Sequence, residues 1–342
     1  MNLQSFIKKA PKAELHSHID GGLRVDTILE YAKKYKVELP TYNYSALEEI
    51  LVNDDACVSL VDYFNAFNYT LSVLQTPDAL EQSMFEFLED AHKDHIKYME
   101  ARFSPALHLK RGLSLKQVMD AILKGKEQAE RVHAIKSKVI VCGLRTFSEI
   151  TNMELAQLAV DYKNKGVVAF DLAGEEFGHA AKDHQKAFQI AINNNLCRTV
   201  HAGEADGPHS IAQAIHYLGA QRIGHGTSLI QDKELMQYFV DRQIPLEVCL
   251  SSNTQTKSVN SFQEHPFRQY FDKKIPVTIN TDSTLISGTS LSDEYMIAAK
   301  YFNFDRKEIT SIMRNAFEHS FLPFDEKQDL LKEVDKEWNT FV

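Results

Sequence analysis

The stretch "PKAELHSHIDGG", residues 11–22, brings two histidines together near the start of the chain. An apolar run ends in His16 and His18, and Asp20 and two glycines follow. We predict a strand over 13–19, in which side chains two positions apart point to the same side. Both imidazoles then face one place, either as a hydrogen-bonded pair or as ligands of a metal ion.

Seven further apolar runs have the length and composition of buried strands: 96–104, 138–145, 167–173, 197–203, 222–226, 244–252 and 276–282. Near-continuous apolar strands are typical of a parallel sheet that is covered by helices. Eight strands with helices between them predict an α/β fold, a (β/α)8 barrel.

Three connecting segments carry helix signals, namely apolar residues at helical spacing and a capping residue at an end. They are 114–134, which begins at Ser114; 152–166, which ends at Gly166; and 208–219, which begins at Pro208 and ends at Gly219. The segment 26–95 is too long for one crossover, so we predict an inserted helical lobe after the first strand. The chain beyond 290 is predicted as extra helices, and residues 1–342 as a single domain because no linker is visible.

Composition limits the class of function. The net charge of -9 and pI near 5.9 argue against binding to nucleic acid or to an anionic membrane surface. The four cysteines (Cys57, Cys142, Cys197 and Cys249) are too far apart for a cysteine zinc site, and a disulfide framework is unexpected at this size. There is neither a signal-peptide pattern nor a run of about 20 apolar residues, so we expect a cytoplasmic protein that acts on a small molecule.

Further polar residues end other predicted strands. His201 and Glu204 follow one strand in "TVHAGE", His225 ends the next in "RIGHG", and Asp282 ends the last in "TINTDS". These strand ends meet at the mouth of a barrel, where barrel enzymes have their active sites. Three imidazoles and a carboxylate form a ligand set well suited to Zn²⁺. The pattern favours a metal site over histidines that only pack.

The other ten histidines lie on predicted helices or connections, and most are expected to have solvated or capping roles. They are His92, His95, His108, His133, His179, His184, His209, His216, His265 and His319.

The motifs "ELHSHIDGG", "ARFSP", "DLAGEE", "HAGE", "RIGHG", "SSN" and "NTDS" occur in this order between residues 14 and 283. In this combination the chain resembles the adenosine deaminase family of the metal-dependent amidohydrolase superfamily, and in particular its bacterial-type members. The resemblance implies a (β/α)8 barrel with one zinc ion at its mouth. It implies that the zinc ligands are His16, His18, His201 and Asp282.

The resemblance also implies roles in catalysis. Glu204 corresponds to the proton donor, His225 to the histidine beside the attacking water, and Asp282 to the acceptor of that water's proton. A protonated Glu204 would donate to the purine N1 and make C6 electrophilic. The implied reaction is zinc-dependent hydrolytic deamination of adenosine, and of 2′-deoxyadenosine, to inosine and ammonia in purine salvage.

Four residues are implied in substrate binding: His18 and Asp20 at the nucleoside, Gly174 at a purine ring nitrogen, and Ser283. Asp20 also suits a turn before two glycines, and Gly174 also suits a turn with positive φ. Ser283 stands where the family usually has a second aspartate that contacts N7, and a serine hydroxyl can still donate there. Two alternatives therefore stay open, a deaminase of adenine or another 6-aminopurine, and a catalytically silent nucleoside-binding protein.

Overall fold

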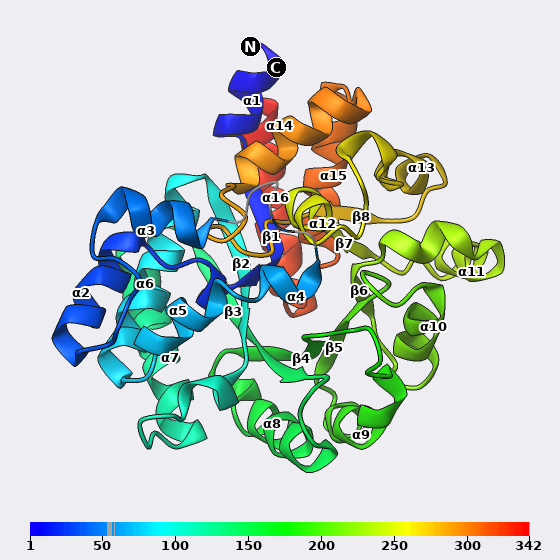
Figure 1. Cartoon of the computed structure of the whole chain (residues 1–342). Helices are drawn as coiled ribbons and strands as arrows, with labels where there is room; N and C mark the ends of the chain where they lie inside the picture. Colours follow the sequence, from blue (N-terminus) through cyan, green and yellow to red (C-terminus); the bar gives the residue numbers. More distant parts are fainter. Residues whose placement is uncertain (53–56, 58, 342) are drawn as a thin grey trace.

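The computed structural model of the chain describes residues 1–52, 57 and 59–341. Eight parallel strands follow one another around a single sheet (Figure 1), and a bridge between Ser17 and Asp282 joins the last strand to the first. They are β1 (Lys12–His18), β2 (Ile96–Phe103), β3 (Lys136–Leu144), β4 (Val167–Ala173), β5 (Cys197–Ala202), β6 (Arg222–His225), β7 (Leu246–Val248) and β8 (Val277–Ile279). The predicted (β/α)8 barrel is confirmed.

Helices surround this ring of strands (Figure 1) and bury its outer apolar face. Those that follow strands in the barrel are α7 (Leu115–Val132), α8 (Glu149–Asp161), α9 (Gln185–Asn193), α10 (Pro208–His216), α11 (Lys233–Arg242), α12 (Leu250–Gln255) and α13 (Phe267–Asp272). The signals at Ser114 and Pro208 are confirmed: Ser114 forms a capping box at the start of α7, and Pro208 opens α10. The prediction of one helix over 152–166 is wrong, because α8 ends at Asp161 and a 3-10 turn leads from there to Gly166.

The described part of the segment 26–95, without residues 53–56 and 58, is mainly helical, as predicted. It contains most of α2 (Val25–Tyr35) and all of α3 (Tyr44–Leu51), α4 (Leu60–Tyr63), α5 (Phe67–Val73) and α6 (Pro77–Lys93). Helix α6 packs on α7 and β2, whereas α4 and α5 lie over the mouth of the barrel (Figure 1). The inserted segment therefore covers the mouth of the barrel.

The tail beyond 290 is helical as well. It forms α14 (Leu291–Phe302), α15 (Arg306–Glu318) and α16 (Phe324–Asn339), and α1 (Leu3–Lys9) lies near them. The indole Nε1 of Trp338 donates to the Pro11 carbonyl at 3.2 Å, and Phe6 contacts Phe341 edge to face. These contacts fasten the two ends of the chain beside β1.

Two predicted strands are too long. The prediction of 244–252 is wrong beyond β7, because residues from Leu250 onward form α12. The prediction of 276–282 is wrong beyond β8, where Asp282 takes a left-handed conformation with φ +62°. After β7 the apolar Cys249 and Leu250 hide the departure from the sheet, whereas after β8 the polar residues 280–282 already leave it.

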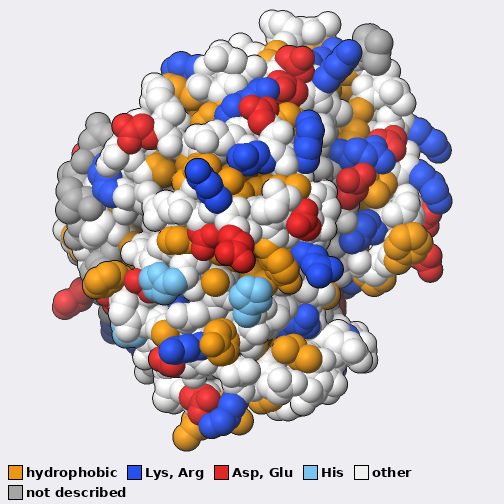
Figure 2. Space-filling view, turned by 90° about the vertical axis from the view of Figure 1, so that its right-hand side faces the viewer, with side chains coloured by type: hydrophobic (Ala, Val, Ile, Leu, Met, Phe, Trp, Pro, Cys, Tyr) orange, Lys and Arg blue, Asp and Glu red, His pale blue; other side chains and the backbone are white. Residues whose placement is uncertain are grey.

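Charges of both signs are interspersed over the face shown in Figure 2. Among the described residues, no helix is both long and apolar enough to cross a membrane. The solvated or capping roles expected for most other histidines are wrong for His108 and His265, because both are buried, and His184 is buried as well.

Candidate metal centre and active site

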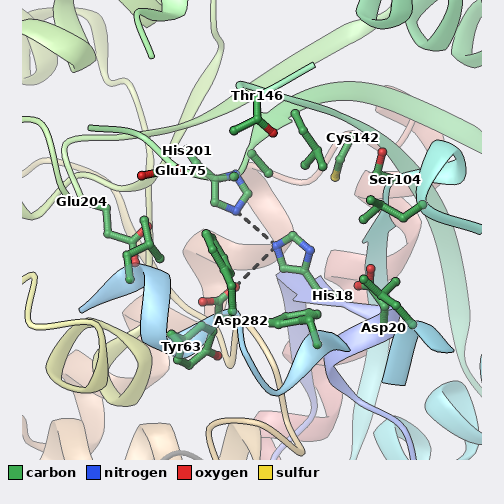
Figure 3. A pocket seen from close by; sticks show the side chains of 18 of the residues that line it. His18, Asp20, Tyr63, Ser104, Cys142, Thr146, Glu175, His201, Glu204 and Asp282 are labelled. Atoms are coloured by element: carbon green, nitrogen blue, oxygen red, sulfur yellow. Dashed lines mark hydrogen bonds and ion pairs between the residues drawn. The ribbon is translucent and has the colours of Figure 1, made fainter. Parts of the chain in front are cut away.

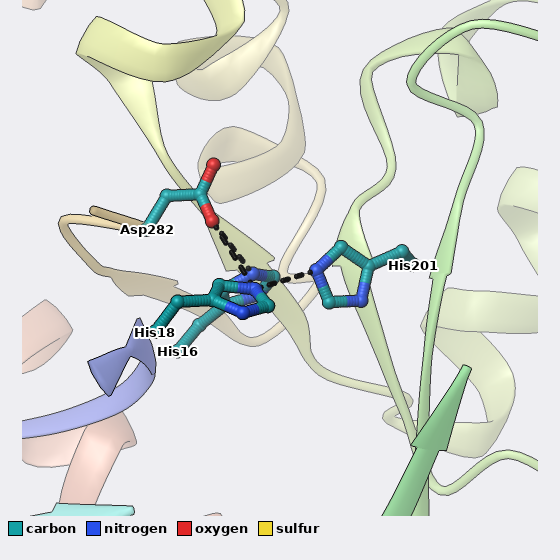
Figure 4. A group of neighbouring side chains, drawn as sticks. All are labelled: His16, His18, His201 and Asp282. Carbon is teal, nitrogen blue, oxygen red and sulfur yellow. Dashed lines mark hydrogen bonds and ion pairs between the residues drawn. The ribbon is translucent and has the colours of Figure 1, made fainter. Parts of the chain in front are cut away.

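Four predicted ligands converge at the mouth of the barrel (Figure 4). His16 and His18 come from β1, His201 from β5, and Asp282 from the turn after β8. The Nε2 atoms of His18 and His201 are 3.2 Å apart. Asp282 Oδ1 lies 3.3 Å from Nε2 of His16 and 3.5 Å from Nε2 of His18. The structure thus brings together all four residues that the sequence singled out.

These atoms fit a metal ion. The Nδ1 atom of His16 lies 2.9 Å from the buried carboxylate of Glu247, which accepts its proton. The Nε2 atom of the neutral ring then carries a lone pair; it is buried and makes no hydrogen bond, although Asp282 Oδ1 is near. A cation between the two would satisfy both acceptors. Ligands at about 2.0–2.2 Å from a tetrahedral zinc lie roughly 3.3–3.5 Å apart, close to the separations seen here.

A buried ion network orients two of the ligands. Asp171 on β4 accepts from Nδ1 of His201 at 3.0 Å, as Glu247 on β7 accepts from His16. The guanidinium of Arg102 on β2 donates to both carboxylates, at 3.0 Å to Asp171 and 2.8 Å to Glu247. Carboxylates in this position fix the tautomer and direction of a metal-binding imidazole. Arg102 therefore connects the supports of two ligands across the barrel.

Left-handed backbone aims two of the site's side chains. His225 ends β6 with φ +63°, and Asp282 has φ +62°. Such values are uncommon outside glycine and occur where surrounding contacts enforce them. Ser252 on α12 enforces one of them, since its hydroxyl donates to Asp282 Oδ2 at 2.7 Å. Oδ1 is left to face the histidines.

A cavity of about 280 Å³ opens onto three of the four ligands, His18, His201 and Asp282 (Figure 3). His18, His201, His225, Asp282, Asp20, Gly174 and Glu204 all line it. The insertion adds an apolar wall, which consists mainly of Leu60, Tyr63, Phe64, Phe67 and Leu71. The cavity combines polar groups at its floor with aromatic and aliphatic side chains above, as small-molecule sites commonly do.

Glu204 lies in this cavity with its carboxyl group almost fully buried. Its side chain is 6 % exposed, its Oε1 has no hydrogen-bond partner among the described residues, and Oε2 lies 3.5 Å from Nε2 of His225. Burial, together with the charges of Asp282 and Glu176, raises the pKa of Glu204 well above its usual value. The surroundings of Glu204 therefore favour its protonated form.

The loop that carries Glu204 is held by Glu176. One carboxylate accepts from four successive backbone N–H groups, of Gly203 at 2.6 Å, Glu204 at 2.8 Å, Ala205 at 2.5 Å and Asp206 at 3.2 Å. Glu176 is itself buried. This arrangement fixes the direction in which Glu204 enters the cavity.

Asp20 and Gly174 lie in the cavity wall at some distance from Glu204. Asp20 is buried, its Oδ1 has no hydrogen-bond partner among the described residues, and burial raises its pKa to about 7. The expected turn role of Asp20 is confirmed, because it lies in the 3-10 turn Ile19–Gly21, and its contact with a substrate stays a prediction. Gly174 has φ +90°, so the turn at the end of β4 requires glycine while its backbone faces the cavity.

Ser283 is placed differently. It is fully buried, it is not among the residues that line the cavity, and its side chain packs against the backbone of Gly21. The hydroxyl of Tyr63, from the insertion, lies 2.8 Å from Ser287 Oγ one helical turn further on. The predicted contact of Ser283 with the substrate stays a prediction.

The sequence reasoning missed the residues behind the ligands, although three of them carry a signal. Asp171 and Glu247 are single charges inside the otherwise apolar stretches "AFDLA" and "PLEVC", and Arg102 is one of two charges in "MEARF". A charge that is buried on both sides of a sheet needs a partner, and here the partners are one another and the ligands. Glu176 and His265 carry no such signal, because they lie in connections.

The fold and the site define the class of protein. A (β/α)8 barrel with three histidines and an aspartate converging at its mouth, and a carboxyl group beside them, is a metal-dependent hydrolase of the amidohydrolase type. A family model described as Adenosine deaminase matches residues 11–337. The chain belongs to the adenosine deaminase family, which catalyses hydrolytic deamination of adenosine.

Two relatives illustrate the similarity. The "Adenosine deaminase" of Clostridium kluyveri is 41% identical over 332 residues, which are 97% of this chain and 94% of that protein. The "Probable adenosine deaminase" of Dictyostelium discoideum is 44% identical over 317 residues. That match includes 93% of this chain but only 41% of the longer protein.

Solved structures share the fold over almost the whole chain. The adenine deaminase of Arthrobacter aurescens has a TM-score of 0.90 at 26% identity and covers 97% of this chain and 99% of its own. An N6-mAMP deaminase of Arabidopsis has a TM-score of 0.87 at 28% identity, with the same coverage. The family thus includes members whose names state different 6-aminopurine substrates.

Proposed function

We propose that this chain is a zinc-dependent adenosine deaminase that converts adenosine and 2′-deoxyadenosine, with water, to inosine or 2′-deoxyinosine and ammonia. One observation carries the proposal: the ligand cluster and the buried Glu204 face one cavity that also contains the unpaired carboxyl group of Asp20. A metal site, a proton donor and a polar anchor for a sugar are the three requirements of this reaction. The cytoplasmic location and the single domain expected from the sequence remain predictions.

The metal would be held by His16, His18, His201 and Asp282. When bound, zinc lowers the pKa of water toward 7 and so supplies a nucleophile at neutral pH. Nitrogen ligands with one carboxylate suit zinc, and the Nδ1 protons donated to Glu247 and Asp171 leave Nε2 of His16 and His201 free to bind it.

Proton transfer falls to two carboxyl groups. Glu204 holds a proton that it donates to N1 of the purine, which draws electrons from C6 and prepares it for attack. Asp282 would accept the proton of the attacking water. Contacts with the neighbouring histidines outweigh its burial and lower its pKa, so the carboxyl group is ionised and has an oxygen available for a proton. His225 contacts the attacking water from beside Glu204.

Substrate binding is assigned to the opposite wall. Asp20 and His18 would bind a ribose hydroxyl, and the backbone N–H of Gly174 would donate to the purine N3. The aromatic side chains of the insertion would cover the base. This placement favours a nucleoside, since free adenine has nothing to offer Asp20.

A second candidate is deamination of adenine or of a 6-aminopurine nucleotide. Ser283 does not decide between the substrates, because its uncharged side chain is buried outside the cavity. Solved structures of an adenine deaminase and an N6-mAMP deaminase share the fold. The identity of about 40% to proteins named adenosine deaminase still ranks adenosine first.

A substrate panel tests the proposal. The zinc-loaded protein, with its metal content measured on the same sample, is given adenosine, 2′-deoxyadenosine, adenine, AMP and N6-methyl-AMP. The reaction is monitored by the loss of adenosine absorbance. We expect the highest kcat/KM with the two nucleosides. Turnover of adenine or a nucleotide alone would replace the proposed substrate, and no turnover of any of them would leave only a binding protein.

A further inference from the structure

His225 lies between two polar neighbours that define its two ring nitrogens. Nδ1 is 2.9 Å from the amide nitrogen Nδ2 of Asn253, which lies in the first turn of α12. Nε2 points into the cavity toward Glu204 Oε2, at 3.5 Å. A neutral imidazole carries its proton on only one of these nitrogens, and the two choices have opposite chemical consequences. A proton on Nε2 makes His225 a donor to the reacting centre, and a proton on Nδ1 makes it an acceptor.

The contacts behind His225 continue to a fixed donor. The other end of the Asn253 amide, Oδ1, lies 3.2 Å from Nε2 of His265. On the far side of that ring, Nδ1 of His265 accepts from the backbone N–H of Phe267 at 3.1 Å. Asn253 and His265 are 0% and 3% exposed, so water does not compete for these bonds.

The direction of each of these hydrogen bonds follows from the bond between the backbone N–H of Phe267 and Nδ1 of His265. A backbone N–H only donates, so Nδ1 of a neutral His265 is an acceptor and its proton lies on Nε2. Burial lowers the pKa of His265 to about 3, which keeps it neutral. Its Nε2–H donates to Asn253 Oδ1, which leaves the amide NH₂ of Asn253 to face His225. That NH₂ donates to Nδ1 of His225.

We propose that Asn253 and His265 are positioning residues that keep the proton of neutral His225 on Nε2, so that His225 acts as a hydrogen-bond donor toward the reacting centre. The assignment of that centre rests on the proposed function. It follows that His225 orients the attacking water and stabilises negative charge on it, whereas the proton of the water goes to Asp282. It follows too that the amide of Asn253 opposes protonation of His225 at Nδ1.

The experiment reads the tautomer directly. The full chain is labelled with ¹⁵N in its histidine rings, loaded with zinc and studied by NMR without substrate. The chain has fourteen histidines, and the signals of His225 are identified as the set that is missing in the His225→Gln variant. We expect protonated Nε2 and bare Nδ1 for His225 in the wild type. A proton on Nδ1 would overturn the proposal.

Two variants test the cause. Asn253→Asp puts a carboxylate beside Nδ1, so we expect the tautomer of His225 to reverse and kcat on adenosine to fall about 10- to 100-fold, with KM little changed. His265→Phe keeps a buried ring but removes the anchor of the amide, so we expect a mixture of tautomers and a smaller loss. Wild-type signals of His225 in both variants would contradict the proposal.

The chain offers a matched control. Asn152 Nδ2 lies 2.9 Å from Nδ1 of the buried His184, and Nε2 of His184 lies 3.2 Å from the Arg145 carbonyl. The same substitution there, Asn152→Asp, should alter the signals of His184 and leave those of His225 unchanged. Absence of adenosine turnover by the wild type would overturn the proposed function separately, because the tautomer is measured without substrate.

Discussion

Strands β1–β4 are 7, 8, 9 and 7 residues long, whereas β5–β8 have 6, 4, 3 and 3 residues. The long-strand half provides Asp20, Gly174 and the walls of the cavity, and the insertion follows its first strand. The short-strand half provides Glu204, His225 and Asp282, two of them on left-handed backbone. Early departure from the sheet lets the chain turn reactive side chains inward, while the long strands carry His16 and His18 and the residues proposed to bind the substrate.

The largest expected effect concerns the proton donor of the short-strand half. Glu204→Gln keeps the shape and the metal ligands but removes the proton that Glu204 donates, so we expect kcat on adenosine to fall roughly 10²- to 10⁴-fold. Metal content per chain is measured on the same sample and should equal that of the wild type. Glu175→Gln, which changes another carboxyl group in the wall of this cavity, should cause a much smaller loss. A similar fall in kcat in the two variants would contradict the assignment of Glu204 as the proton donor.

Arg102 joins the two halves, since it contacts Asp171 on β4 and Glu247 on β7. Arg102→Lys cannot make both contacts in the same geometry, and we expect zinc affinity to fall about 10- to 100-fold. The measurement is competition with a chelator of known affinity. Arg222→Lys is the matched control: Arg222 is equally buried and contacts Glu247 Oε1 at 2.6 Å, but His16 lies against the other oxygen. Equal losses would indicate general damage to the barrel.

His265 supports the short-strand half and makes the stability of the protein depend on pH. Its folded pKa of about 3 is below its ordinary value of 6.5, so the unfolded chain binds more protons as the pH falls below about 6.5. Its contribution therefore destabilises the fold progressively from pH 6.5 toward 3. Relative to His265→Phe, the wild type should lose about 2 kcal/mol of unfolding free energy between pH 6.5 and 5. Denaturant unfolding at both pH values measures this difference, and a constant difference would contradict it.

The smallest effect is expected in the long-strand half. Asp20→Asn should raise KM for adenosine about tenfold, corresponding to the loss of one hydrogen bond of about 1.4 kcal/mol, while kcat changes little. Any slow turnover of adenine should be insensitive to the change, because adenine lacks the sugar. A fall in kcat without a change in KM would assign Asp20 to the reaction itself and weaken the division between the two halves.

Much of the site was predictable because its residues end apolar runs. His16, His18, His201 and His225 each follow or end such a run, and the barrel topology alone brings them together. The lengths of β7 and β8 were not predictable, since the residues after them are buried without being in strands: apolar Leu250 lies in α12, and polar Asn280 and Thr281 lead to the turn at Asp282.

The supporting residues were less predictable for a different reason. Their roles depend on which partner lies across the barrel, and spacing along the chain does not contain that information. His265 is the clearest example, because it is 40 residues from His225 and acts on it only through Asn253. Ser283 illustrates the converse: a substitution visible in the sequence says little until the structure shows that its side chain faces Gly21.

The central claim is that one metal ion, held by ligands from both halves, is required for deamination of adenosine. The most direct test is to strip the protein with a chelator and return zinc in steps while following the conversion of adenosine to inosine. We predict no turnover without metal and a linear rise in rate that ends at one zinc ion per chain. Full turnover in the metal-free protein, or a rise that continues to two ions per chain, would contradict the account.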